Sequence, residues 1–156
     1  MATDWDTRYL ELAKHIAQWS KDPSRKIGAV AVGELGQILS LGYNGFPRGI
    51  EDTNERLTNR EEKYKLVVHA EMNVIYNASL NGVSLRGSTL YISGLPMCSD
   101  CVRGVIQVGI KRVVMTYDDP IGDVWTESWN RTAAMLDEAG ISYASFCNSS
   151  GSQPGA

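Results

Sequence analysis

Residues 69–101 read HAEMNVIYNASLNGVSLRGSTLYISGLPMCSDC, and their pattern decides the fold. Apolar residues at helical spacing predict a helix over residues 68–81, and the β-rich run Thr89–Ser93 predicts a strand. A second helix is predicted from Cys98 to Val108, where Gly109 follows. The segment therefore has the helix–strand–helix order that is typical of an α/β protein.

The flanking sequence continues this alternation. Helices are also predicted over Trp5–Ser20 and Trp125–Ala139, and strands over Ile27–Val32, Ile38–Tyr43, Arg112–Thr116 and Ile141–Phe146. Strand–helix–strand order implies parallel pairing with right-handed crossovers, and the opening pair of strands adds an antiparallel hairpin. We expect an α/β fold, a three-layer α/β/α sandwich around a mixed five-stranded sheet.

The length of 156 residues suits one domain, which we place at residues 1–147. Residues 148–156 are mostly Ser, Gly, Pro and Gln, so they have little to bury and are predicted to be a flexible tail. Arg48–Lys65 is polar and lacks clear periodicity. It is predicted to be a long loop, a kind of segment that is usually functional in a compact domain.

The charge balance limits the partners of the chain. Its formal net charge is −3 and its Lys and Arg residues are scattered, which argues against a nucleic-acid polymer as partner. A small phosphorylated ligand stays open, because one phosphate needs only a few local donors. No stretch approaches the roughly 20 apolar residues of a membrane span, and no secretory signal pattern is visible. We therefore expect a cytoplasmic protein that has no membrane partner.

Three residues in the opening stretch have the chemistry of a zinc site. A catalytic zinc takes three protein ligands and keeps one position for water, and His69, Cys98 and Cys101 supply one nitrogen and two thiolates. The cysteines lie three apart at the predicted start of a helix, so both sulfurs can face one ion. The positive end of the helix favours the thiolate form.

Glu71 follows His69 by two residues and is the candidate proton carrier. Zinc lowers the pKa of a coordinated water towards about 7. Glu71 would take a proton from that water, pass it to a ring nitrogen and help ammonia to leave. Such chemistry replaces the exocyclic amine of an aromatic base with oxygen.

Each part of this group has a simpler interpretation. The Cys-x-x-Cys pair also occurs in redox motifs and as half of a structural zinc site, while Glu71 alone would pass for an exposed helix residue. A redox pair would be expected near a first strand and helix. A structural zinc needs a fourth ligand, and neither His15 nor Cys147 forms a spaced pair with another ligand. The conjunction of three ligands and a carboxylate at two helix starts favours catalysis.

H-x-E…P-C-x-x-C is the signature of zinc nucleobase deaminases, and the chain resembles the cytidine/deoxycytidylate deaminase superfamily. The resemblance runs from about Tyr9 to Phe146. It includes the segments Ser20-Lys21-Asp22-Pro23, Ile27-Gly28-Ala29-Val30, Gly42-Tyr43-Asn44-Gly45-Phe46-Pro47, His69-Ala70-Glu71-Met72-Asn73 and Ile106-Gln107-Val108-Gly109-Ile110-Lys111. Within the superfamily, the Gly-Tyr-Asn-Gly run and Asn73 after the His-Ala-Glu group favour a resemblance to the deoxycytidylate deaminases. Met97 departs from the pattern, because family members usually have proline directly before the first cysteine.

The resemblance implies zinc as cofactor, a small nucleotide or nucleobase as substrate, and a homo-oligomer, for which a hexamer is one option. It also implies that Asn44 and Ala70 contact the substrate, although Asn44-Gly45 is by itself a strong turn signal. Four residues near the first strands are candidate phosphate donors, and each alone is more often a solvated surface group: Ser24, Arg25, Lys26 and Arg48.

Trp125 and Trp129 lie four apart and share a helix face. They could stack on a base, fill the core or form a subunit contact, and core or interface is the more usual role of such residues. We nevertheless include Trp125 among the candidate substrate contacts. The leading function is conversion of deoxycytidylate to a uracil nucleotide and ammonia. Alternatives are deamination of another aminated base, nucleoside or heterocycle, and a zinc-stabilised binding module without catalysis.

Overall fold

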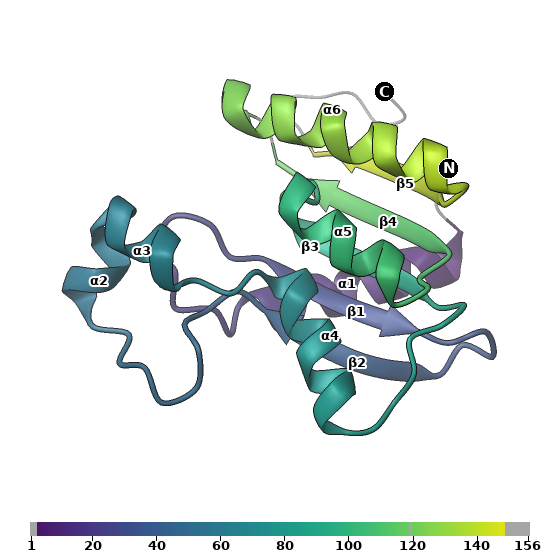
Figure 1. The fold of residues 1–156 in the computed structure, drawn as a ribbon, viewed down its shortest axis with the longest axis horizontal. Coiled ribbons are helices and arrows are strands. Elements are labelled where there is room, and N and C mark those ends of the chain that lie inside the picture. The colour runs from purple at the N-terminus through teal and green to yellow at the C-terminus, as the bar shows by residue number, and fades with distance from the viewer. Residues whose placement is uncertain (1–2, 119, 149–156) are drawn as a thin grey trace.

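A five-stranded sheet forms the middle layer of the protein in a computed structural model that describes residues 3–118 and 120–148 (Figure 1). The elements are α1 (Asp4–Ala17), β1 (Gly28–Val32), β2 (Ile38–Tyr43), α2 (Asn54–Thr58), α3 (Arg60–Leu66), α4 (Ala70–Leu80), β3 (Thr89–Gly94), α5 (Ser99–Gln107), β4 (Arg112–Tyr117), α6 (Gly122–Ala139) and β5 (Ser142–Cys147). The strand order is β2-β1-β3-β4-β5. β1 is antiparallel to β2 and β3, whereas β3, β4 and β5 run parallel.

Helices cover both faces of the sheet. α1 packs on one face, behind the sheet in Figure 1, while α4, α5 and α6 cover the other. The central strands alternate accordingly: Ala29 and Ala31 of β1 face the core under α4 and α5, and Val30 and Val32 face α1. This period of two is what a strand buried on both faces requires. The predicted α/β/α sandwich with a mixed sheet is confirmed.

A glycine in β2 determines how closely α4 can approach the sheet. A Cβ atom added at Gly42 would lie 2.6 Å from both the Ala70 carbonyl oxygen and the Val74 nitrogen. Contacts that short do not occur between real atoms, so a side chain there would push the first turn of α4 away. Gly42 thus allows the start of α4, where His69 and Glu71 lie, to rest directly on the strand.

The prediction of a long loop over Arg48–Lys65 is wrong, because the segment contains α2 and α3. Both helices are short and polar, and Lys63 is their one buried residue. They therefore lack the apolar period that a helix prediction relies on. Their start signals are nevertheless in the sequence, since the side chains of Thr53 and Asn59 cap α2 and α3 by accepting from Arg56 N–H and Glu62 N–H.

The other predicted elements are present with shifted ends. The first helix ends at Ala17 and not at Ser20, and the last begins at Gly122. Across residues 3–118 and 120–148, the helices are too short or too polar to cross a bilayer. The predicted tail covers residues 148–156, of which only Asn148 lies in the described part of the chain, so the tail and the domain limits at 1–147 stay predictions.

A buried acid ties α1 to the middle of the sheet. Both oxygens of Asp6 accept from Arg112 of β4, each at 2.8 Å, and Oδ1 also accepts from the Tyr91 hydroxyl at 2.7 Å. Asp6 is only 2% exposed. Hydrogen bonds from Arg112 are the main reason that the pKa of Asp6 lies well below its usual range. The ionised form is therefore favoured in the folded state.

Acid should weaken this link. Because the folded pKa of Asp6 is lower than the unfolded pKa of about 4, its contribution is complete above that value and is lost as pH falls below it. We expect Asp6→Asn to lower the free energy of unfolding by about 2 kcal/mol at pH 7, and by progressively less as pH falls below about 4 toward the lowered pKa of Asp6. Urea unfolding at several pH values measures this difference. Asp4→Asn, in the same first turn but exposed, is the control, and an equal effect there would contradict the assignment.

Candidate active site

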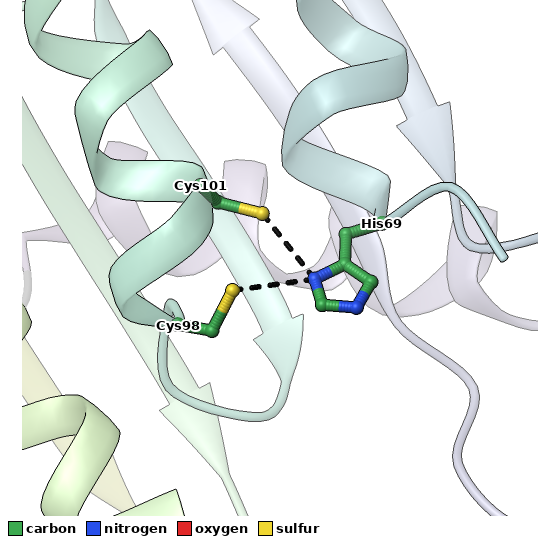
Figure 2. A group of neighbouring side chains, drawn as sticks. All are labelled: His69, Cys98 and Cys101. Atoms are coloured by element: carbon green, nitrogen blue, oxygen red, sulfur yellow. Dashed lines mark hydrogen bonds between the residues drawn. The ribbon is translucent and has the colours of Figure 1, made fainter. Parts of the chain in front are cut away.

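Two helices begin at the same place beyond the carboxyl end of β3. His69 is the N-cap of α4 and Cys98 is the N-cap of α5, and neither side chain forms the usual capping hydrogen bond. Figure 2 shows both side chains turned toward each other, with Cys101 joining them from the first turn of α5. Side chains at the starts of two helices that are distant in the sequence therefore form a single cluster.

The cluster has the donors and the spacing of a zinc site. Nδ1 of His69 lies 3.3 Å from the sulfurs of both Cys98 and Cys101, and the three ligand atoms lie within 4.8 Å of one another. Tetrahedral zinc with bonds of about 2.0–2.3 Å places such atoms about 3.5 Å apart. The three residues can therefore hold one zinc ion with little movement.

Electrostatics within the cluster favour a cation. Hydrogen bonds from Cys101 and His69 lower the pKa of the Cys98 thiol to about 4, against the effect of burial. The hydrogen bond with Cys98 in turn raises the pKa of His69 to about 9. A thiolate is thus stabilised by protons on its neighbours, and a metal ion that takes their place displaces those protons.

Glu71 lies in the first turn of α4 and lines the cavity next to these ligands. It is 4% exposed. Burial raises the pKa of Glu71 to about 7, although the charge of His69 acts in the other direction. A carboxyl group with a pKa near neutrality can both accept and donate a proton, and a cation beside it would favour the ionised form.

A cavity of about 300 Å³ opens over the ligand cluster. This volume is at the lower end of the range for small-molecule sites. Several segments that are distant in the sequence line the cavity: Asp22, Ser24, Arg25 and Ile27; Asn44; Thr58, Arg60, Lys63, Tyr64 and Val67 from the α2–α3 segment; His69, Ala70 and Glu71; Leu95 and Pro96; and Ile121 and Trp125.

Asn44 and Ala70 both lie at this cavity, as expected for substrate contacts. The side chain of Asn44 accepts from Ile27 N–H at 2.9 Å and donates to the Arg25 carbonyl at 2.9 Å. One donor hydrogen and one acceptor site remain on the amide. Ala70 is the first residue of α4, so its N–H has no intrahelical acceptor.

The four candidate phosphate donors separate into two groups. Ser24 and Arg25 line the cavity, but the Arg25 guanidinium donates to the carbonyls of Asp118 and Pro120. The structure does not bring Lys26 and Arg48 to the cavity. Lys26 Nζ donates to the Ser20 carbonyl, and Arg48 donates to the Asn77 side chain on α4.

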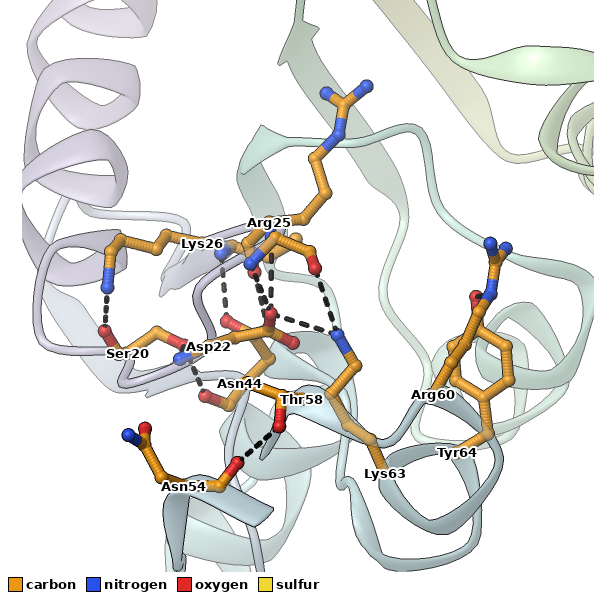
Figure 3. A network of polar contacts seen from close by, with 12 residues as sticks. Ser20, Asp22, Arg25, Lys26, Asn44, Asn54, Thr58, Arg60, Lys63 and Tyr64 are labelled. Carbon is orange, nitrogen blue, oxygen red and sulfur yellow. Dashed lines mark hydrogen bonds and ion pairs between the residues drawn. The ribbon is translucent and has the colours of Figure 1, made fainter. Parts of the chain in front are cut away.

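The α2–α3 segment supplies cavity residues that the sequence interpretation missed. Lys63 Nζ lies 3.1 Å from Asp22 Oδ1 and 3.3 Å from Ser24 Oγ, and both ion-pair partners are buried (Figure 3). Arg60 lies over the Tyr64 ring and its Nε donates to the Tyr64 hydroxyl at 2.9 Å. The cap at Asn59 was the signal in the sequence that could have located this helix.

The two tryptophans of α6 differ in role. Trp125 lines the cavity, and its ring centre is 6.4 Å from that of His69. Trp129 packs edge-on against Tyr143 at 5.5 Å and contacts the core. Both rings pack against the core, and Trp125 in addition lies at the cavity.

Comparison with known proteins agrees with this site. The family model of the cytidine and deoxycytidylate deaminase zinc-binding region matches residues 3–117. The chain is 35% identical over 150 residues to the deoxycytidylate deaminase of Pongo abelii, covering 92% of this chain and 80% of that protein. It is 36% identical over 149 residues to the probable deoxycytidylate deaminase of Drosophila melanogaster, covering 89% and 70%.

A solved structure supports the same relationship. The dCMP deaminase of the cyanophage S-TIM5, in complex with dCMP and dUMP, superposes with a TM-score of 0.73 at 26% identity. The match covers 94% of this chain and 99% of that one. The similarity therefore extends over the sheet, its helices and the cavity-lining segments.

The cavity wall should depend on the buried ion pair. Replacing Lys63 by Met leaves Asp22 buried without its partner, so we expect Lys63→Met to lower the free energy of unfolding by about 3 kcal/mol. Denaturant unfolding measures this change. Lys65→Met is the control, because Lys65 pairs with Glu61 on the surface of the same helix and should change stability by less than about 0.5 kcal/mol. Equal effects of the two substitutions would contradict the assignment.

Proposed function

The chain belongs to the cytidine and deoxycytidylate deaminase family with its zinc-binding region, and from this membership we propose that it converts deoxycytidylate to deoxyuridylate and ammonia. It is a zinc-dependent hydrolytic deaminase. The observation that carries the proposal is the buried carboxyl group of Glu71 beside the His69–Cys98–Cys101 cluster, in the lining of a cavity of about 300 Å³. A zinc that only stabilised the fold would have no use for such a carboxylate.

His69, Cys98 and Cys101 would hold the zinc, which when bound lowers the pKa of water in its open position towards about 7. Glu71 accepts a proton as water adds to C4 of the base. It passes this proton to N3. It then carries the proton of the new C4 hydroxyl to the exocyclic amine, so that the C4–N bond breaks, ammonia leaves and C4 becomes the carbonyl carbon of the uracil product. Each transfer needs a group that can both gain and lose a proton. Burial raises the pKa of Glu71 and a neighbouring cation lowers it, so the two effects oppose each other at this carboxyl group.

The cavity walls orient the base. The backbone N–H of Ala70 lies at the positive end of α4 and is suited to the base carbonyl oxygen. Trp125 offers an aromatic surface near His69. The remaining donor and acceptor of Asn44 are available to the sugar or the base, while its other two bonds keep the Arg25–Ile27 wall in place.

Ser24, Arg60 and Tyr64 are the proposed contacts of the phosphate. All three line the cavity, and the Arg60 guanidinium carries a charge that a phosphate would pair with. The ammonium of Lys63 is already occupied by Asp22 and Ser24, so it acts mainly by holding Ser24 in position. A basic group at the mouth distinguishes a nucleotide from a free nucleoside.

The alternatives fit the structure less well. Another aminated base or nucleoside would not need Arg60 at the cavity, and a zinc-stabilised binding module would not need Glu71. A nucleic-acid polymer conflicts with the net charge of −3. Deoxycytidylate accounts for the cluster, the carboxylate and the basic mouth together.

We further propose that the reaction takes place in the cytoplasm and in a homo-oligomer. Cys98 and Cys101 must stay reduced to act as ligands, which a reducing compartment ensures. Exposed apolar residues near β2, including Ile38 and Leu80, are 51% and 72% exposed and are suited to contact another copy.

A substrate panel tests the proposal. Zinc-loaded protein should release ammonia from deoxycytidylate and much more slowly from cytidylate, deoxycytidine and cytosine. Glu71→Gln keeps the shape of the side chain but not its proton chemistry. We expect it to retain zinc and to lower kcat by about 10²–10⁴-fold. Zinc content by metal analysis and ammonia release by a coupled assay measure both. Full activity of Glu71→Gln would contradict the mechanism.

Arg60 should determine the preference for a phosphate. Arg60→Ala removes a charged hydrogen-bond donor from the mouth, and we expect kcat/KM for deoxycytidylate to fall about tenfold while deoxycytidine is unaffected. Steady-state kinetics with both substrates measure this. Arg48→Ala is the matched control, because Arg48 contacts Asn77 outside the cavity. If Arg48→Ala alone lost deoxycytidylate turnover, the assignment of the phosphate site to Arg60 on α3 would be wrong.

A further inference from the structure

The first turn of α5 carries both zinc cysteines but lacks a cap of its own. Cys98 occupies the N-cap position without forming a capping hydrogen bond, and its sulfur faces His69 and Cys101. In other helices a Ser, Thr, Asp or Asn at this position holds the first turn. The peptide groups around Cys98 must therefore be held from elsewhere.

Two hydroxyl groups of α6 hold them. Ser99 N–H donates to Ser128 Oγ at 2.9 Å, and the Ser128 hydroxyl donates to Ser99 Oγ at 3.3 Å. Thr132 Oγ1 donates to the Met97 carbonyl at 3.0 Å. Ser128 and Thr132 lie four apart, so both project from one face of α6. They contact the chain on either side of Cys98.

The presence of Met97 makes the hydrogen bond from Thr132 more important for fixing the chain before Cys98. A proline at position 97 would have a fixed φ and no N–H, which would stiffen the chain before Cys98. Met97 leaves that φ free. Its N–H donates to Met115 Sδ at 3.5 Å, a weak acceptor, and its side chain is fully buried. Thr132, which is also fully buried, holds the carbonyl of the same residue.

We propose that Ser128 and Thr132 are positioning residues that hold Cys98 and Cys101 in the geometry that zinc requires. The inference rests on the zinc site of the proposed function, but it concerns metal affinity and not deamination. Groups that orient metal ligands through hydrogen bonds commonly change affinity by about 10–100-fold when they are removed. α6 is then part of the metal site, although it supplies no ligand.

The test measures zinc affinity by competition with a chelating indicator. Ser128→Ala should weaken zinc binding about tenfold, and Thr132→Val, which keeps the shape of Thr132 without its hydroxyl, should do the same. Ser128→Thr and Thr132→Ser keep the hydroxyl groups and should restore affinity. Thr126→Ala is the matched control, because Thr126 is an exposed hydroxyl residue of α6 that donates to the Gly122 carbonyl. It should bind zinc like the unaltered protein.

A purely structural role of these hydroxyls gives a different result. It lowers the unfolding free energy of the zinc-free protein and leaves zinc affinity unchanged, and that outcome would overturn the proposal. So would equal loss of affinity in Thr126→Ala. Where Ser128→Ala does not fold, the pair Thr132→Val and Thr132→Ser decides by the same comparison. The readout is zinc affinity and not activity. If the protein binds zinc but does not turn over deoxycytidylate, the proposed function is wrong while this inference still stands.

Discussion

Two helix N-termini meet beyond the carboxyl end of one strand, and the site depends on that meeting. His69 and Cys98 are in N-cap positions, where a side chain usually satisfies a backbone N–H of its own helix. Both side chains instead face the other helix, so local capping is given up and three ligand atoms gather within 4.8 Å. Tertiary contacts have to compensate. Gly42 allows α4 to rest on β2, and α6 places hydroxyl groups around the start of α5.

The same meeting explains the electrostatic character of the site. Two thiols, an imidazole and a carboxyl group are brought together with little access to water, and two positive helix ends face them. Burial raises the pKa of Glu71 to about 7, while hydrogen bonds from Cys101 and His69 lower that of Cys98 to about 4. Such a set stabilises a bound cation and keeps one group able to exchange protons.

The core and the cavity wall are held by different forces. The core follows apolar alternation, with Leu90 and Ile92 of β3 on one face of the sheet and Tyr91 on the other. The α2–α3 wall buries almost no apolar surface and depends on capped first turns and the ion pair between Lys63 and Asp22. Its position relative to the cavity therefore depends on charge more than on hydrophobic packing.

The sequence by itself determined the layers, the strand pattern and the reactive group. A spacing of 2 or 3.6 residues between apolar positions shows which face of a strand or helix is buried. One histidine, two cysteines and a glutamate at the starts of two helices are recognisable in the sequence as a possible zinc site. Only the tertiary structure decided which distant residues meet. In the folded chain the Asn44 amide is hydrogen-bonded to Arg25 and Ile27. Lys26 and Arg48 lie outside the cavity, whereas α3 and the hydroxyl groups of α6 lie at the site. Local periodicity does not contain this information, because such distances depend on how helices pack and where loops run.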